Sequence, residues 1–67
     1  MVKPYWIKER HNPQLGVYYV AMGQKSVREA KKFEKSLYGM NYMHRFDSER
    51  EYIAELEKLR AAGETIR

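Results

Sequence analysis

The chain has 67 residues and no cysteine, and its 13 Lys and Arg residues against 9 Asp and Glu give a formal net charge of +4. A chain of this length forms one domain and buries only about 60% of its unfolded surface, so its core must be thin. The lack of cysteine excludes disulfides, thiolate metal sites and cysteine nucleophiles. No apolar run approaches the roughly 20 residues of a membrane span, and the N-terminus lacks a secretory signal. We therefore expect a cytoplasmic protein without membrane contact.

Two stretches near the N-terminus predict a pair of strands. Residues 4–11 and 16–22 are rich in aromatic and β-branched residues. The Asn-Pro pair that begins at Asn12 suits a type I turn, and Gly16 can supply a positive φ where the chain returns. We expect a hairpin with a four-residue loop, in which His11 faces Gly16.

The remaining elements are indicated by capping chemistry and by periodicity. Ser26 stands three residues before Glu29, and this S-x-x-E capping box predicts a helix over residues 26–38. Large residues alternate over 40–46, which predicts a third strand. A second S-x-x-E motif predicts a helix over 48–62, after which we expect the last few residues to fray.

The element order ββαβα restricts the topology. A right-handed crossover through the first helix places the third strand beside the first, in spatial order 2-1-3. We therefore predict a single α+β domain, residues 1–67, with a three-stranded antiparallel sheet and two helices packed on one face. The second strand then forms an open edge with few charges to discourage pairing with another chain.

The predicted hairpin loop decides which side chains face away from the helices. Alternation places Tyr5, Ile7, Val20 and Met22 toward the helices, and it assigns Tyr18 to the core with them. A loop longer by one residue would shift the pairing and flip the faces of one strand. The predicted outer face interleaves aromatic rings with cations: Trp6, Lys8, Arg10 and Tyr19, joined by Arg45 from the third strand.

The predicted first helix exposes an almost purely cationic side, and its opposite, apolar side consists of Val27, Ala30, Phe33 and Leu37. Its i,i+4 pairs of like charge cost a few tenths of a kcal/mol each, which suggests an anionic partner. Lys is also a good helix former that keeps small proteins soluble, and this interpretation stands beside the first. The excess of cations lies in residues 1–46, whereas residues 47–67 are net negative. The cationic side consists of Arg28, Lys31, Lys32 and Lys35.

Two kinds of binding surface fit these patterns. Aromatic rings stack on bases while cations neutralise phosphates, so the first is a surface for nucleic acid, DNA or RNA, with little sequence specificity. Trp, Tyr and Arg also dominate protein interfaces, so the second is a protein-interaction or homodimer surface that uses the aromatic hairpin and the open strand edge. A third interpretation is a sheet on which Trp6 and Tyr19 only shield each other. We place nucleic acid first because the cationic helix also supports it.

The sequence indicates no reactive site, so we expect a non-enzymatic protein without metal or cofactor. His11 and His44 lie far apart and lack metal-ligand spacing. Capping explains Ser26 and Ser48 without a nucleophile. The glycines are isolated, and none belongs to a phosphate-binding loop.

Residues 5–37 combine a Trp- and Arg-bearing strand pair, a Gly turn and a helix that opens with Ser-x-x-Glu-Ala. This combination resembles the small DNA-binding domains at the N-terminus of tyrosine recombinases. The resemblance implies that the outer sheet face would enter a groove of DNA. Those domains place three strands before the helix, whereas this chain places two before it and one after, so we do not assign the chain to that family.

Overall fold

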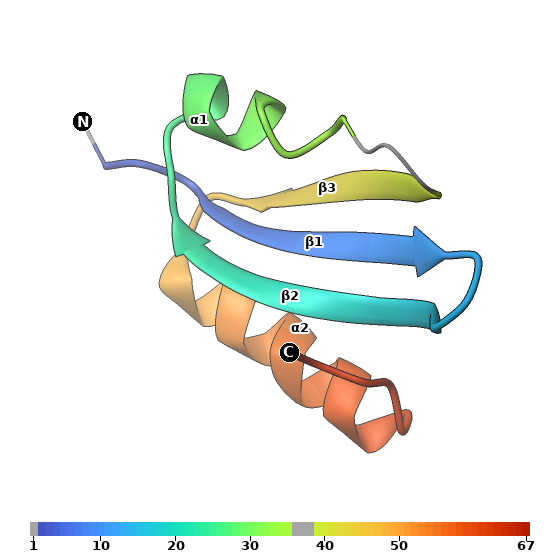
Figure 1. Ribbon diagram of the computed structural model, residues 1–67. Helices are drawn as coiled ribbons and strands as arrows, with labels where there is room; N and C mark the ends of the chain where they lie inside the picture. Colours follow the sequence, from blue (N-terminus) through green and yellow to red (C-terminus); the bar gives the residue numbers. More distant parts are fainter. Residues whose placement is uncertain (1, 36–38) are drawn as a thin grey trace.

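The computed structural model describes residues 2–35 and 39–67 and contains the five predicted elements in the predicted order. The strand order is β2-β1-β3, and both strand pairs are antiparallel (Figure 1). The small α+β fold with its central first strand is therefore confirmed. The elements are β1 (Tyr5–Asn12), β2 (Gly16–Gln24), α1 (Val27–Lys31), β3 (Met40–Phe46) and α2 (Glu49–Ala61).

The hairpin loop is one residue shorter than predicted. Asn12 pairs with Gly16 and stays in the strand ladder, so three residues form the loop. The Asn12 side chain closes this loop, because its Oδ1 accepts the backbone N–H groups of Gln14 at 2.8 Å and Leu15 at 2.9 Å. Gly16 supplies the positive φ, 85°. The predicted register is therefore wrong by one residue, and β2 presents opposite faces from those expected as far as Ala21.

A bulge interrupts β2 near its end. Ile7 pairs with Ala21 but Trp6 pairs with Gly23, which leaves Met22 as the extra residue. The backbone N–H of Gly23 donates a hydrogen bond to the Tyr52 hydroxyl at 3.1 Å, so α2 satisfies a donor at the bulge.

The two helices lie on opposite sides of the sheet (Figure 1), which corrects the expected packing on one face. Trp6 and Ile7 are neighbours in β1, so their side chains point to opposite faces, yet they are only 7% and 1% exposed. On the Ile7 side, the ring of Tyr5 stacks on Tyr52 of α2 at 5.1 Å. On the Trp6 side, Trp6 Nε1 donates to the backbone oxygen of Lys25 at 2.7 Å. Because each face of β1 carries a large apolar residue, a single helical layer could bury only one of them.

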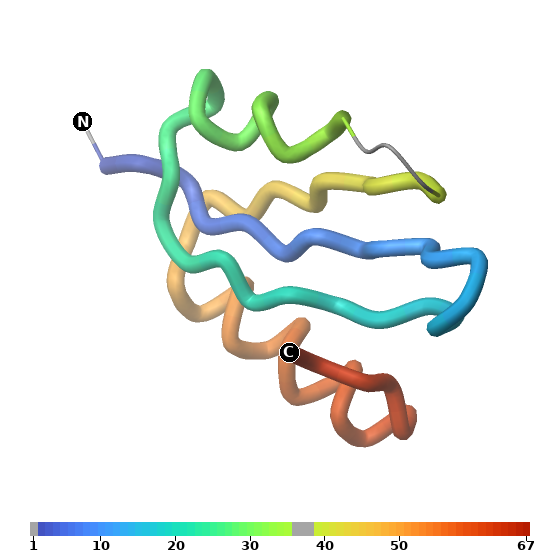
Figure 2. The backbone as a smooth tube through the Cα atoms, viewed as in Figure 1, coloured from blue at the N-terminus to red at the C-terminus, as the bar shows by residue number. Residues whose placement is uncertain are grey.

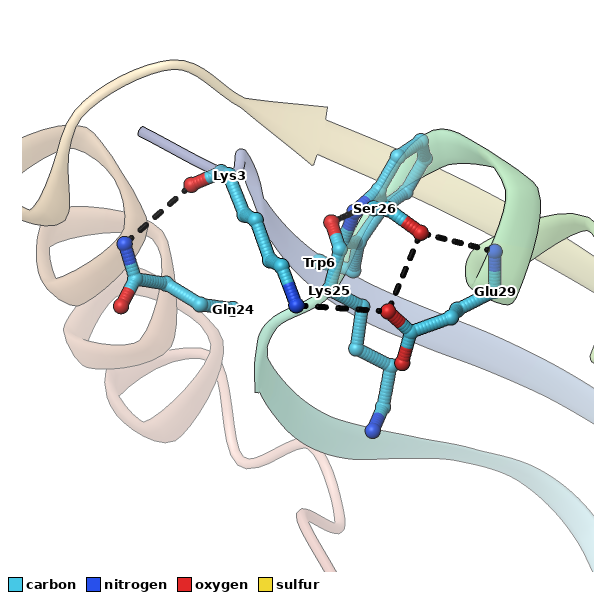
Figure 3. A network of polar contacts seen from close by, with 6 residues as sticks. All are labelled: Lys3, Trp6, Gln24, Lys25, Ser26 and Glu29. Atoms are coloured by element: carbon cyan, nitrogen blue, oxygen red, sulfur yellow. Dashed lines mark hydrogen bonds and ion pairs between the residues drawn. The ribbon is translucent and has the colours of Figure 1, made fainter. Parts of the chain in front are cut away.

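The start of α1 forms as predicted. Ser26 Oγ accepts the backbone N–H of Glu29 at 3.1 Å, and the Glu29 carboxylate lies 3.1 Å from the same hydroxyl and 3.5 Å from Lys3 Nζ (Figure 3). These contacts lower the pKa of Glu29, chiefly through the hydrogen bond from Ser26. The capping residues thereby tie α1 to the segment before β1.

Helix α1 ends sooner than the predicted residue 38. It closes at Lys31, and the next three backbone N–H groups bond to carbonyls three residues back, as in a 3₁₀ turn. The carbonyl of Phe33 accepts a hydrogen bond from Asn41 Nδ2 at 2.6 Å, which replaces a helical partner. Residues 36–38 of the predicted helix lie outside the described residues.

The C-terminal residues pair with β2, which corrects the predicted fraying and the predicted open edge. Gly63, with φ of 80°, ends α2, and the chain then turns back along β2 (Figure 2). Tyr19 forms a parallel bridge with Ile66, in which its N–H donates to Thr65 O at 2.8 Å and its carbonyl accepts from Arg67 N at 2.7 Å. We call residues 65–67 the tail strand.

Candidate nucleic-acid interface

The sheet face covered by α1 carries a row of basic residues along β1. Cross-strand pairing places Lys8 between Val20 and Met43, and Arg10 in the row of Tyr18 and Asn41. The exposed side of α1 continues this surface. We call the whole surface the basic face; its cations are Lys8, Arg10, Lys25, Arg28, Lys31, Lys32, Lys35, Arg45 and Arg67.

Trp6 belongs to this side of the sheet but does not form part of its surface. Its ring is buried beneath the start of α1, and its indole N–H is satisfied by the backbone of Lys25. Figure 3 shows the ring enclosed between β1 and the segment that leads into α1. The expected outward position of Trp6 is therefore wrong, and the ring has no free face on which a base could stack.

Two other aromatic rings on the basic face, Phe33 and Tyr18, form cation–π contacts. Lys8 Nζ lies 5.8 Å and Lys25 Nζ 5.7 Å from the centre of the Phe33 ring. The Arg67 guanidinium lies 4.5 Å from the centre of the Tyr18 ring. Cation–π contacts of this kind fix the positions of flexible cationic side chains without neutralising their charge.

The cations that extend the face along α1 and the turn after it remain available. Residues 28–35 include four basic residues, and all four are exposed. Within the described part of the chain, none of these four forms an ion pair. They are Arg28, Lys31, Lys32 and Lys35. The charge of Arg45 is partly offset, because its Nε donates to Asp47 at 2.9 Å. Arg10 donates to the Asn41 side chain at 3.2 Å.

Tyr19 lies on the opposite face, away from the other predicted binding residues. It pairs with Glu9 of β1 and faces α2, where it shares a cavity of about 80 Å³ with Glu55. Burial raises the pKa of the Tyr19 hydroxyl, and the nearby carboxylates of Glu9, Glu64 and Glu55 raise it further. This surrounding negative charge disfavours a phosphate at Tyr19. We call the side of the sheet that carries Glu9 and is covered by α2, with Glu55, the acidic face.

A carboxylate between two imidazoles occupies the acidic face. Glu9 Oε2 lies 2.5 Å from His11 Nε2, and its Oε1 lies 2.9 Å from His44 Nε2. The hydrogen bond with His11 is the main cause that lowers the pKa of Glu9, and His44 adds to it, whereas partial burial opposes the shift. This cluster has no signal in the local sequence, because His44 comes from β3 and meets Glu9 only through strand pairing. Across the described ranges 2–35 and 39–67, no group of three or more His, Cys, Asp or Glu residues is arranged to hold a metal ion.

The lowered pKa of Glu9 predicts acid sensitivity. In the unfolded chain the pKa of a Glu is about 4.3. Because the pKa of Glu9 is lower in the folded state, folding favours its ionised form. Its contribution to the free energy of unfolding is full above that value and is lost as the pH falls through the lower native pKa. Urea unfolding near neutrality and at about pH 3 should therefore show a smaller acid-induced loss in Glu9→Gln than in the unchanged chain. Equal losses would show that the cluster does not stabilise the carboxylate.

Several residues of the basic face were not predicted. Tyr18 was assigned to the core because the assumed hairpin loop was one residue too long. Arg67 reaches the face through the tail strand, for which the sequence offers no local signal. Phe33 was placed on the apolar side of a longer helix. Alternation around a three-residue loop would have found Tyr18.

Comparison with known proteins gives no assignment, because no family model, curated protein or solved structure matches the chain. Over the residues that the structure describes, no helix has both the length and the apolar character needed to cross a membrane.

Proposed function

We propose that this chain is a small, non-catalytic cytoplasmic module that binds nucleic acid through phosphate contacts on its basic face. The observation that carries the proposal is the separation of charge across the sheet. Lys8, Arg10 and the cations of α1 lie on one side, whereas Glu9 and Glu55 lie on the other. A surface with one dominant sign attracts a polyanion and orients it.

The geometry favours phosphate contacts over base stacking. Trp6 is buried, and cations lie against Phe33 and Tyr18. Lys and Arg side chains neutralise phosphates regardless of sequence, so we expect little discrimination between sequences. Binding of this kind has a Kd on the order of 10⁻⁴ to 10⁻⁶ M at physiological salt.

A protein interface is the second candidate function, and one observation favours it. Three large apolar or aromatic residues are exposed at the hairpin end of the acidic face. Met40 and Tyr42 of β3 are 58% and 42% exposed, and Val17 of β2 is 43% exposed. His11 lies between Val17 and Met40 in the register of the sheet. Apolar and aromatic residues grouped in this way suit a protein partner. In the intact chain the tail strand pairs with the outer edge of β2, so the exposed residues named above carry this candidate.

Salt-dependent binding tests the nucleic-acid proposal. Fluorescence anisotropy with labelled single- and double-stranded DNA and RNA, between about 50 and 200 mM salt, should show a steep loss of affinity. The Lys32→Ala/Lys35→Ala double variant should bind more weakly. Its slope of log K against log salt on duplex DNA should be smaller by up to about 1.8, because each lost phosphate contact contributes about 0.9.

The matched control removes two cations from α2. Lys58→Ala/Arg60→Ala lowers the net charge by the same amount, but both residues belong to the helix on the acidic face. Its salt slope should remain that of the unchanged chain. Equal effects of the two double variants would indicate a general charge effect, and absent binding to every probe would reject the proposal.

A further inference from the structure

The tail strand pairs with β2 through regular backbone hydrogen bonds. Tyr19 exchanges two of them, with Thr65 O at 2.8 Å and Arg67 N at 2.7 Å. A third runs from Ala21 N to Arg67 O at 3.3 Å. The edge of β2 therefore accepts an added strand in parallel orientation.

The side chains of the tail strand alternate as those of a strand do. Ile66 pairs with Tyr19 on the acidic face and is half-buried. The next residue, Arg67, lies over the ring of Tyr18 on the basic face. The edge thus offers two side-chain positions, one for an aliphatic group and one for a cation.

The edge of β2 is prone to pair with another strand, and only a few hydrogen bonds hold the tail strand that now pairs with it. Residues Gly16–Gln24 include no charged side chain, so β2 lacks the charges that commonly prevent edge pairing. Within the described residues, three backbone bonds join the tail strand to β2, and Gly63 separates it from α2. Thr65 and Arg67 remain exposed. Release of the tail strand breaks these three bonds and none of the hydrogen bonds within the β1–β2 and β1–β3 ladders.

We propose that the β2 edge is a docking site for an extended segment of a partner protein, in which an aliphatic residue followed by a basic residue replaces Ile66 and Arg67. The tail strand is then an intramolecular ligand that competes for the edge. Strand addition of this kind takes affinity from backbone bonds and specificity from alternate side chains. The docking site uses the edge of the sheet, so it does not depend on nucleic-acid binding by the basic face.

Competition with the tail strand gives the proposal a direct test. A tethered segment acts at an effective concentration in the millimolar range, so it weakens binding of an identical free peptide. The probe is a labelled peptide with the sequence of residues 62–67. We expect it to bind a chain that ends at Glu64 at least about tenfold more tightly than the intact chain. A peptide with Glu at the position of Arg67 should bind more weakly, because it loses the cation over Tyr18.

Hydrogen exchange locates the peptide. The amides of Tyr19 and Ala21 donate to the tail strand, so they should exchange faster in the shortened chain and regain protection when the peptide binds. Protection elsewhere, or equal peptide affinity for both chains, would overturn the proposal. So would concentration-dependent dimerisation of the shortened chain, which would make a second copy the occupant.

A full-length variant covers the case in which the shortened chain does not fold. Arg67→Pro removes the N–H that bonds to the Tyr19 carbonyl, whereas Arg67→Ala keeps this N–H and removes only the cation. Peptide affinity should rise more in Arg67→Pro than in Arg67→Ala. If the shortened chain and Arg67→Pro both unfold, the tail strand is an indispensable part of the sheet and the proposal fails.

Discussion

Replacing Trp6 by alanine should leave much of the protein unfolded in buffer. Removing a buried Trp side chain costs about 3–5 kcal/mol, and Trp6 is only 7% exposed. The same change leaves the carbonyl of Lys25 without the donor that now lies 2.7 Å away. A domain of this size has a total stability of roughly 3–10 kcal/mol, at about 0.05–0.15 kcal/mol per residue. Urea unfolding followed by circular dichroism measures the loss.

A conservative change at the same residue separates stability from binding. Trp6→Phe keeps most of the apolar ring and loses the indole donor, so we expect a folded protein that is about 1–3 kcal/mol less stable. Its affinity for nucleic acid should match that of the unchanged chain, because the ring lies beneath α1. A folded Trp6→Phe variant that has lost binding would show that the indole contacts the partner.

Local chemistry explains what the sequence predicted correctly. Ser26 with Glu29, and Ser48 with Glu51, form their capping contacts as the S-x-x-E spacing predicts, because these bonds involve residues of a single turn. The strand order follows from connection lengths and handedness, which the chain order reveals.

The hairpin register shows why a correct fold did not give correct faces. Loops of three and four residues both accommodate Asn-Pro and a following Gly, and the choice depends on whether Asn12 stays in the ladder. That single step exchanges Tyr18 and Tyr19 between the two faces. The prediction therefore placed Tyr19 on the wrong face. Lys8 and Arg10 of β1 lie on the predicted side, opposite Ile7.

Long-range pairing explains the rest of what was missed. The tail strand reaches β2 from the other end of the chain, and its partners Tyr19 and Ile66 have no signal in their local sequence. The separation of charge also arises from the fold. The cations of α1 and the carboxylates of α2 lie on opposite sides of the sheet only because these two helices cover different faces.

Gly39→Ala should destabilise the protein strongly, for two additive reasons. Gly39 has φ of 80°, and a left-handed conformation costs a residue with a side chain about 1–2 kcal/mol. An added Cβ would also lie 2.0 Å from the backbone oxygen of His11 and 3.1 Å from Pro13 Cδ. The backbone at the end of β1 would have to move, which costs about 1–3 kcal/mol more. We therefore expect a loss of about 2–5 kcal/mol in the free energy of unfolding.

Gly63→Ala is the matched control, because it imposes the same backbone strain without the close approach. Gly63 also has φ of 80°, but no atom lies within 4 Å of its added Cβ. Its loss should be limited to about 1–2 kcal/mol. The difference between the two variants in urea unfolding then measures how tightly Gly39 packs against His11 and Pro13. Equal losses would mean that backbone strain alone requires glycine at residue 39, and that the contact with His11 relaxes at no cost.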